Sequence, residues 1–403
     1  MENKKTLIIH QPYLSIIDDN KVRLCSDIEY DGKSNHIWYE TDREWEKFLC
    51  YERADAFLVN ILLFAMEHNA DVHCDCDISE RLYYQLSEYL IPSISTNIEK
   101  YHSISITGNL SAERFVSANA CGTGVSGGVD SMYTIFRHID RNDQHNITHL
   151  VFCNAGTNGD FGGEDARKTY KERRTFLTQF AERLHLPIVS VDTNINEFLN
   201  QLQEPTSTFR TLSTALVFQK LFSVYYYGSS YPFSDFAFSV NNPSHYELLN
   251  MVCISTENIT FYCSGGETTR LGKLRLISNY DLPKQYLNVC ITGGIPNCGY
   301  CEKCRRTIMG LYAMGQLDEY NDVFNIEKIK RNIFKHKCFT YFHRKDLDWP
   351  EVYNSLRNSK EITRMNIITY YLYLLFSIPG IIICKLKTHM PLWQAANHVV
   401  YNS

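Results

Sequence analysis

Residues 124–131 read Gly-Val-Ser-Gly-Gly-Val-Asp-Ser and run directly into the helical pattern Met132–Arg137. Adjacent glycines permit backbone conformations that are closed to other residues, so consecutive N–H groups can converge on an anion at the start of a helix. Ser126 and Ser131 can add hydroxyl donors. The Asp130 carboxylate would repel a phosphate unless it holds a Mg²⁺ ion that bridges the two groups. The stretch therefore predicts a loop that binds a nucleotide together with a metal ion.

Another reading of the same loop stays open. Gly124–Gly128 also satisfies the pattern G-x-S-x-G, in which Ser126 would be the nucleophile of a hydrolase. Such an enzyme needs an acid and a histidine further along the chain, and Asp235 and His245 are candidates. This reading leaves Asp130 without a role, and a glycine turn that binds nothing is the remaining alternative.

The chain around the loop predicts three parts. Residues 1–115 indicate a small α/β domain, with strands at 6–9, 71–74 and 103–106 around a long helix at 42–68. In residues 116–320, strand and helix patterns alternate, which is typical of βαβ units and predicts a doubly wound parallel sheet. Residues 321–403 turn helical and basic. The middle part is expected to contain strands at 148–154, 187–192, 259–263 and 287–290, helices at 164–185, 268–279 and 302–315, and a helix that runs into a strand over 212–227.

Four of the 14 cysteines crowd together as C-x7-C-x2-C-x2-C, at Cys290, Cys298, Cys301 and Cys304. Four thiolates complete the tetrahedron that Zn²⁺ accepts and leave no position open for catalysis. We therefore expect a structural zinc that pins the helix at 302–315 onto the sheet. An iron–sulfur cluster is the alternative, because four cysteines suit it as well, and unliganded thiols are the third reading.

The composition indicates where in the cell the protein is located and which kinds of partner it binds. The 403 residues are 44% hydrophobic and carry 40 Lys and Arg against 45 Asp and Glu, so we expect a globular protein without a nucleic-acid partner. Ten scattered cysteines and an N-terminus that lacks a secretory pattern favour the cytoplasm. The uncharged stretch 367–384 is divided by Pro379 and Gly380, and we expect it to form a buried helical hairpin rather than a membrane contact.

Residues 126–131, Ser-Gly-Gly-Val-Asp-Ser, closely resemble the S-G-G-x-D-S phosphate-binding loop (PP-loop) of the ATP pyrophosphatase superfamily. The spacing of the four cysteines and their distance from the loop are similar to those of the 7-cyano-7-deazaguanine synthases within that superfamily. The resemblance covers residues 116–315 and implies a HUP/Rossmann-like fold. Those enzymes lack counterparts of residues 1–115 and of the C-terminal extension, so the substrate is not carried over.

The resemblance also implies an activity and a set of residues. ATP would be cleaved between its α and β phosphates, AMP would pass to a carboxylate or carbonyl oxygen, and ammonia or an amine would then displace AMP. This is the chemistry of a ligase that forms an amide, which can be dehydrated to a nitrile. The nucleotide would be bound by Ser126, Gly127, Gly128, Val129, Asp130 and Ser131, with Mg²⁺ on Asp130, while Asn154 at the end of the second strand would lie beside the adenine.

Further candidates follow the later strands. The stretch 264–270, Ser-Gly-Gly-Glu-Thr-Thr-Arg, is a second candidate anion site at the start of a helix. Arg270 and Lys273 lie one helical turn apart and could compensate the charge of phosphates or of a carboxylate, although a solvated basic helix face is an equal alternative. Ser229 and Ser230 are candidate substrate contacts at the end of a strand.

The expected partner is a carboxylate acceptor, either a small molecule or a protein or peptide bound by residues 1–115, and we expect a homo-oligomer. Two other functions remain open. A tRNA or small-molecule sulfurtransferase would use the same ATP chemistry but needs a catalytic cysteine pair and a basic surface. A non-catalytic nucleotide-binding module would bind ATP without releasing pyrophosphate.

Overall fold

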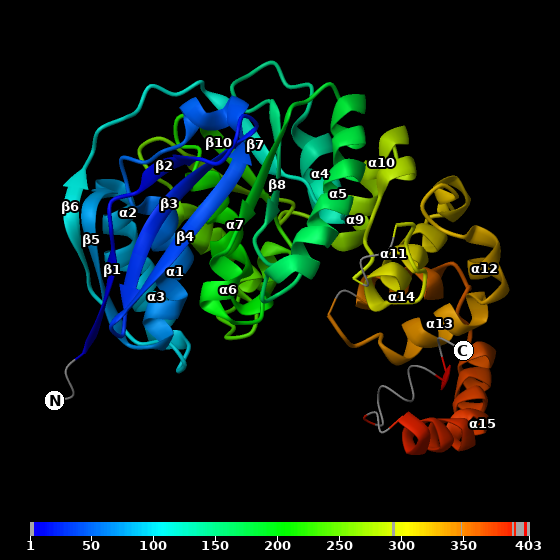
Figure 1. Ribbon diagram of the computed structural model, residues 1–403. Helices are drawn as coiled ribbons and strands as arrows, with labels where there is room; N and C mark the ends of the chain where they lie inside the picture. The colour runs from blue at the N-terminus through cyan, green and yellow to red at the C-terminus, as the bar shows by residue number, and fades with distance from the viewer. Residues whose placement is uncertain (1–3, 292–294, 348, 389–390, 392–398, 401–403) are drawn as a thin grey trace. The chain divides into compact units, whose positions relative to one another are not determined.

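The computed structural model describes residues 4–291, 295–347, 349–388, 391 and 399–400 (Figure 1). The chain divides into two compact units. Unit 1 takes in Met1–Ser126 and Asp130–Thr269, and unit 2 takes in Gly127–Val129 and Arg270–Ser403. The fold is α/β, as expected.

Unit 1 is built on a mixed sheet of eleven strands in the order β11-β10-β7-β8-β9-β4-β3-β1-β5-β6, with β2 paired to β3. Its strands are β1 (Lys5–Ile9), β2 (Tyr13–Ile16), β3 (Lys21–Tyr30), β4 (Lys33–Asp42), β5 (Ala70–Ser79), β6 (Ile106–Ser111), β7 (Ala120–Gly124), β8 (His149–Asn154), β9 (Ile188–Thr193), β10 (Phe222–Gly228) and β11 (Thr260–Ser264). Its helices are α1 (Asp55–Glu67), α2 (Glu80–Gln85), α3 (Ile91–Asn97), α4 (Val129–His138), α5 (Gly163–Arg183), α6 (Ile195–Leu199), α7 (Ser207–Leu216) and α8 (Glu247–Ile254).

Five neighbouring strands, β9-β8-β7-β10-β11, are parallel throughout. The chain begins in the middle of this group with β7, adds β8 and β9 on one side, and then adds β10 and β11 on the other. The winding therefore reverses beside β7, which is the place where open α/β sheets commonly bind ligands. The strands predicted at 148–154, 187–192 and 259–263 and the helix predicted at 164–185 are confirmed within one or two residues.

The strands of residues 1–115 join the same sheet, because β4 pairs antiparallel with β9 through Tyr39 and Glu40. The single long helix expected at 42–68 is wrong: a short 3₁₀ turn at Arg43–Phe48 is followed by a separate helix, α1. Between them, the Cys50 and Ala54 N–H groups donate to Val217 and Asp77 carbonyls, so this backbone is paired outside any helix. Helix α1 is buried almost throughout, as its apolar run predicts.

Unit 2 is helical in its described part, with α9 (Arg270–Ile277), α10 (Asp281–Tyr286), α11 (Glu302–Ala313), α12 (Ile326–Arg331), α13 (Ile333–Phe342), α14 (Trp349–Asn358) and α15 (Arg364–Thr388). The strand expected at 287–290 is wrong, since these residues pair with none of the described strands. The Asn297 side chain satisfies their backbone instead: its amide donates to the Leu287 carbonyl and its oxygen accepts from the Val289 N–H, both at 2.8 Å.

The buried hairpin expected at 367–384 is also wrong. The segment belongs to one helix, α15, which continues through Pro379. Only 11% of its most apolar 18-residue window is buried. The proline lacks an N–H to give to the helix, but helices tolerate that loss with a kink, so a Pro-Gly pair does not by itself end one.

Candidate functional site

The glycine-rich loop connects the central parallel strand β7 to helix α4. The Val125 N–H donates to the Val151 carbonyl at 2.8 Å, which extends the pairing of β7 with β8 up to the loop. Gly127 has φ +77, and a Cβ at this position would lie 3.3 Å from the Asn288 Cβ. Both the conformation and the close neighbour therefore call for glycine.

The polar side chains of the loop gather at the first turn of α4. The Ser131 hydroxyl lies 3.3 Å from the Ser126 N and 3.2 Å from the Ser126 Oγ. Asp130 is half-buried, and its carbonyl accepts a bond from the Thr134 hydroxyl at 2.9 Å. A Cβ at Gly228 would lie 3.0 Å from the Asp130 carbonyl oxygen, so the end of β10 passes close to this turn. The Ser126 and Ser131 hydroxyls thus meet where the winding reverses, next to the backbone of Asp130.

Arg173 on α5 is a candidate that sequence reasoning missed. Its guanidinium donates to the Ser126 carbonyl at 3.1 Å and to the Asn158 Oδ1 at 3.2 Å. This places a permanent positive charge beside the loop, where phosphate charge would need compensation. No local motif marks the residue, because the contact depends on how α5 packs back on the sheet.

Asn154 ends β8 in a polar cluster. Its side-chain amide donates to the Asp192 Oδ1 at 2.8 Å, and its carbonyl accepts from the Asn196 amide at 3.2 Å. Burial raises the pKa of Asp192, and the Arg167 Nε lies 3.4 Å from its other oxygen. Since the Asn154 side chain is buried and bonded within the protein, the adenine contact expected there stays a prediction.

In the second glycine-rich stretch, residues 264–270, a carboxylate of the stretch itself accepts a backbone N–H bond. The Glu267 carboxylate accepts bonds from the Gly265 N–H at 2.9 Å and from the Tyr133 hydroxyl at 2.7 Å. Burial would raise the pKa of Glu267, but these bonds outweigh it and hold the pKa below its usual value. The N–H group expected to bind an external anion is therefore engaged by the protein itself.

Arg270 and Lys273 lie at the start of α9, in unit 2. Lys273 is only 1% exposed, so the alternative of a solvated basic helix face is wrong for this residue. The Glu351 carboxylate accepts the Leu271 N–H at 3.1 Å within the same turn. A buried lysine charge must be compensated by groups of the protein. The role of Lys273 in phosphate binding therefore stays a prediction.

The remaining candidates from the sequence are engaged in structural contacts. Ser229 is fully buried, and its hydroxyl donates to the Tyr231 carbonyl at 2.7 Å and contacts Glu247. The Ser230 N–H donates to the same carboxylate at 3.1 Å. His245 stacks on the Tyr231 ring with 4.1 Å between centroids.

The alternative function as a hydrolase requires an aspartate carboxylate that hydrogen-bonds to the histidine. The His245 Nδ1 lies 3.4 Å from the backbone oxygen of Asp235, while the Asp235 carboxylate accepts a bond from Ser234. A carbonyl can orient an imidazole but carries no charge to stabilise an imidazolium. This pair therefore lacks the geometry of an acid–histidine dyad.

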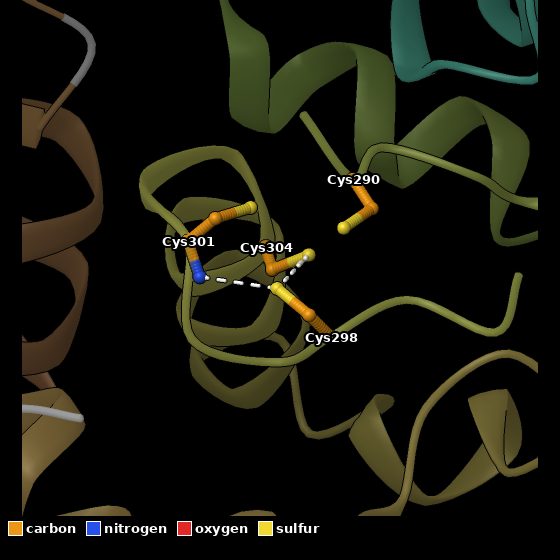
Figure 2. Close-up of side chains that lie close together, drawn as sticks. All are labelled: Cys290, Cys298, Cys301 and Cys304. Carbon is orange, nitrogen blue, oxygen red and sulfur yellow. Dashed lines mark hydrogen bonds between the residues drawn. The ribbon is translucent and has the colours of Figure 1, made fainter. Parts of the chain in front are cut away.

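The four clustered cysteines converge in unit 2 (Figure 2). Their sulfur atoms all lie within 4.8 Å of one another, and the Cys301 N–H donates to the Cys298 sulfur at 3.3 Å. A hydrogen bond from Cys304 lowers the pKa of the Cys301 thiol, whereas burial raises the pKa of Cys298. Four sulfur ligands this close together could hold a metal such as zinc.

A short chain of bonds joins this cluster to the glycine-rich loop within unit 2. The Asn288 N–H donates to the Gly127 carbonyl at 2.8 Å, and Cys290 follows two residues later. Asn297, next to Cys298, holds the backbone on both sides of Asn288. Whatever fixes the cysteines therefore also fixes the segment that contacts Gly127.

The arrangement brings two hydroxyls and a guanidinium to a loop that also carries Asp130, at the reversal point of a parallel sheet, and it brings four sulfur ligands together in unit 2. The first set suits an anion together with a cation, and the second suits a metal without an open coordination position. Comparison of the chain with protein-family models, with curated proteins and with solved structures finds no match.

Proposed function

We propose that the chain is an ATP-dependent, AMP-forming enzyme with the PP-loop chemistry of the ATP pyrophosphatase superfamily. The observation that carries the proposal is the position of Ser126–Ser131: the loop leaves the central parallel strand beside the winding reversal and opens helix α4. Nucleotide phosphates are commonly bound at this place, because backbone N–H groups and the helix dipole favour negative charge there.

Each loop residue has a role in the proposal. The N–H groups of Gly127, Gly128 and Val129 would bind the β and γ phosphates, and the hydroxyls of Ser126 and Ser131 would add donors. Asp130 would hold Mg²⁺, which when bound neutralises the charge of the departing pyrophosphate. Arg173 would compensate charge from the α5 side, and the same role stays a prediction for Arg270 and Lys273.

The reaction would proceed in two displacements. A carboxylate oxygen of the acceptor attacks the α phosphorus of ATP and pyrophosphate leaves, which gives an acyl adenylate. Ammonia or an amine then attacks the acyl carbon and AMP leaves, which gives an amide. The acceptor is a small carboxylate or a peptide or protein, and as in the 7-cyano-7-deazaguanine synthases the amide could be dehydrated to a nitrile.

Two thiols on the central parallel strands, Cys121 and Cys153, argue against sulfur transfer. Burial raises the pKa of Cys121 to about 12 and also raises the pKa of Cys153. A sulfur carrier needs an accessible thiolate. These cysteines are thus better suited to packing than to catalysis.

The four-cysteine cluster would hold a structural Zn²⁺. The donor set fits, because four sulfur atoms that lie within 4.8 Å of one another can complete a tetrahedron. Bound zinc would fix the start of α11 and, through Asn297 and Asn288, the segment that contacts Gly127. Zinc would therefore support the loop without taking part in the reaction.

Product analysis with Mg²⁺ and a panel of carboxylates that includes 7-carboxy-7-deazaguanine tests the proposal, with α-³²P-ATP to follow AMP and γ-³²P-ATP to follow pyrophosphate. We expect AMP and pyrophosphate in equal amounts, with turnover reduced about 100-fold or more in Asp130→Asn. Asp165→Asn makes the same change in the first turn of α5, at an exposed position, and should retain full activity.

Three results would count against the enzyme. ADP and phosphate as products would overturn the assignment of the loop. ATP binding without pyrophosphate release across the panel, unchanged in Asp130→Asn, would indicate a nucleotide-binding module. Equal loss in Asp130→Asn and Asp165→Asn would remove the special role of Asp130.

A further inference from the structure

Helix α15 presents an apolar surface that is exposed in the described part of the chain. Of the described helices, it is the one long and apolar enough to cross a membrane, and Met365–Cys384 carries no charged side chain. Phe376 is 80% exposed and Leu375 is 60% exposed. Large exposed apolar side chains follow the helix along one side: Ile368, Leu372, Leu375, Phe376, Ile382, Ile383 and Leu386. A continuous surface of this kind marks an interaction site.

The opposite side of α15 is covered by the rest of unit 2. The Phe334 ring on α13 packs against Tyr370 and Tyr373, with 5.3 Å between centroids in each pair. Further along, a Cβ at Gly380 would lie 3.1 Å from the Val399 Cγ1, and the Tyr373 hydroxyl donates to the Val400 carbonyl at 2.8 Å. Among the residues that the structure describes, the helix is therefore packed along one side and exposed along the other.

The charges at the ends of α15 are all positive. Arg364 begins the helix, Lys385 and Lys387 lie in its last turn, and no acidic residue occurs within it. The chain as a whole has a net charge of −5, so this surface differs in sign from the molecule that carries it. An apolar stripe with basic ends complements the acyl chains and anionic headgroups of a lipid leaflet.

We propose that α15 lies in the interface of a lipid bilayer, with the stripe from Ile368 to Leu386 among the acyl chains and Lys385 and Lys387 at anionic headgroups. Lysine side chains can reach the headgroups from a helix at this depth. The contacts of Tyr370, Tyr373 and Val400 keep the other side of α15 on the protein. The placement is therefore in the plane of one leaflet, and it is independent of the proposed ATP chemistry.

Vesicle flotation of the full chain tests this proposal. We expect the wild-type protein to float with vesicles of phosphatidylcholine and phosphatidylserine, and to float less with phosphatidylcholine alone. Leu372→Glu/Phe376→Glu places two charges four residues apart on the stripe, where both side chains are exposed and folding is spared. This variant should float about tenfold less or lower still.

The matched control is Asn354→Glu/Asn358→Glu, which adds the same charges with the same spacing at exposed positions of α14. It should float like the wild type. Circular dichroism and thermal melting check that both variants fold.

Four outcomes of the flotation experiment would overturn the proposal. These are a wild-type protein that stays soluble without vesicle binding, a soluble oligomer whose assembly is lost in Leu372→Glu/Phe376→Glu, equal flotation of that variant and the wild type, and equal loss in the control. The second outcome would assign the stripe to another copy of the chain. A C-terminal epitope that becomes protected from added protease would show a span across the bilayer and overturn the in-plane placement.

Discussion

Gly127 is a position at which the loop requires glycine. Gly127→Ala would force an L-residue to φ +77 and set its Cβ 3.3 Å from the Asn288 Cβ. We expect the free energy of unfolding to fall by about 1–2 kcal/mol and the Kd of a non-hydrolysable ATP analogue to rise about tenfold or more. Denaturant titration and calorimetric binding measure the two effects.

Gly315→Ala separates backbone strain from displacement of the loop. Gly315 has φ +72, but a Cβ added there would meet no other part of the described chain within 4 Å, so this variant carries the strain alone. It should lose a similar stability and bind the nucleotide normally. Unchanged nucleotide binding in Gly127→Ala would remove the loop from the proposed site.

Asp55 makes unit 1 less stable as pH rises. It is fully buried, and burial raises its pKa from 3.8 to about 6 even though it accepts bonds from the Ser79 N–H and the Gln219 amide. The folded state therefore binds the proton more tightly than the unfolded state, so stability is lost as pH rises from about 4 through about 6. Two pKa units correspond to about 3 kcal/mol, which is an upper bound.

We expect the stability of Asp55→Asn relative to the wild type to increase from pH 4 to pH 7.5, because the variant has no carboxyl group to lose a proton. Its amide nitrogen faces the Gln219 amide donor where the wild type has an accepting oxygen, so the test is the change with pH. Urea titrations at the two pH values measure this difference. Asp165→Asn, at an exposed helix position, controls for the loss of one negative charge. A difference between Asp55→Asn and the wild type that does not change with pH would contradict the assignment.

At the scale of elements, predictions succeeded where the pattern is local. The sequence pattern predicted where four elements begin and end: the apolar strands β8, β9 and β11 and the amphipathic helix α5. The run at 287–290 also looks like a strand but pairs with none of those described, because the Asn297 amide takes the place of a partner. The glycine-rich loop and the cysteines could be found from spacing alone. Arg173 could not, because its contact joins residues far apart in the sequence.

Arg173 allows a test of the contribution of α5 to nucleotide binding. Arg173→Ala removes the guanidinium that bonds to the Ser126 carbonyl. We expect the KM for ATP to rise about tenfold, since a partly exposed charge contact contributes about 1–2 kcal/mol. Lys171→Ala removes an exposed positive charge from the same helix and should leave the KM unchanged. Equal effects in both variants would point to a general charge effect instead.

At the scale of the whole molecule, the sheet is larger than the sequence pattern indicates. The two halves meet where β4 pairs with β9, through residues more than 150 positions apart. No turn signal or period marks such a pairing, since each strand already satisfies its own local pattern. Because the pairing of β4 with β9 has no local signal, residues 1–115 looked self-contained.

The division into two units predicts how the molecule would respond to loss of the proposed metal. All four clustered cysteines belong to unit 2, whereas the sheet and its core belong to unit 1. We expect the purified chain to contain one zinc, and a chelator to lower the melting temperature of one calorimetric transition by about 10 °C or more while the other is retained. Nucleotide binding should weaken as well, because Asn288 contacts Gly127 from the segment that the metal fixes.

Cysteine variants distinguish the effect of losing the metal from the effect of losing any buried thiol. Cys298→Ser should reproduce the effect of the chelator, and added zinc should restore only the chelated wild type. Cys338→Ser removes a buried thiol of the same unit outside the cluster and should keep the zinc. If the purified protein contained iron and absorbed visible light, the site would be assigned to an iron–sulfur cluster instead of zinc. A chelator that lowers both transitions equally would show that the units unfold together, and that the metal stabilises the whole molecule.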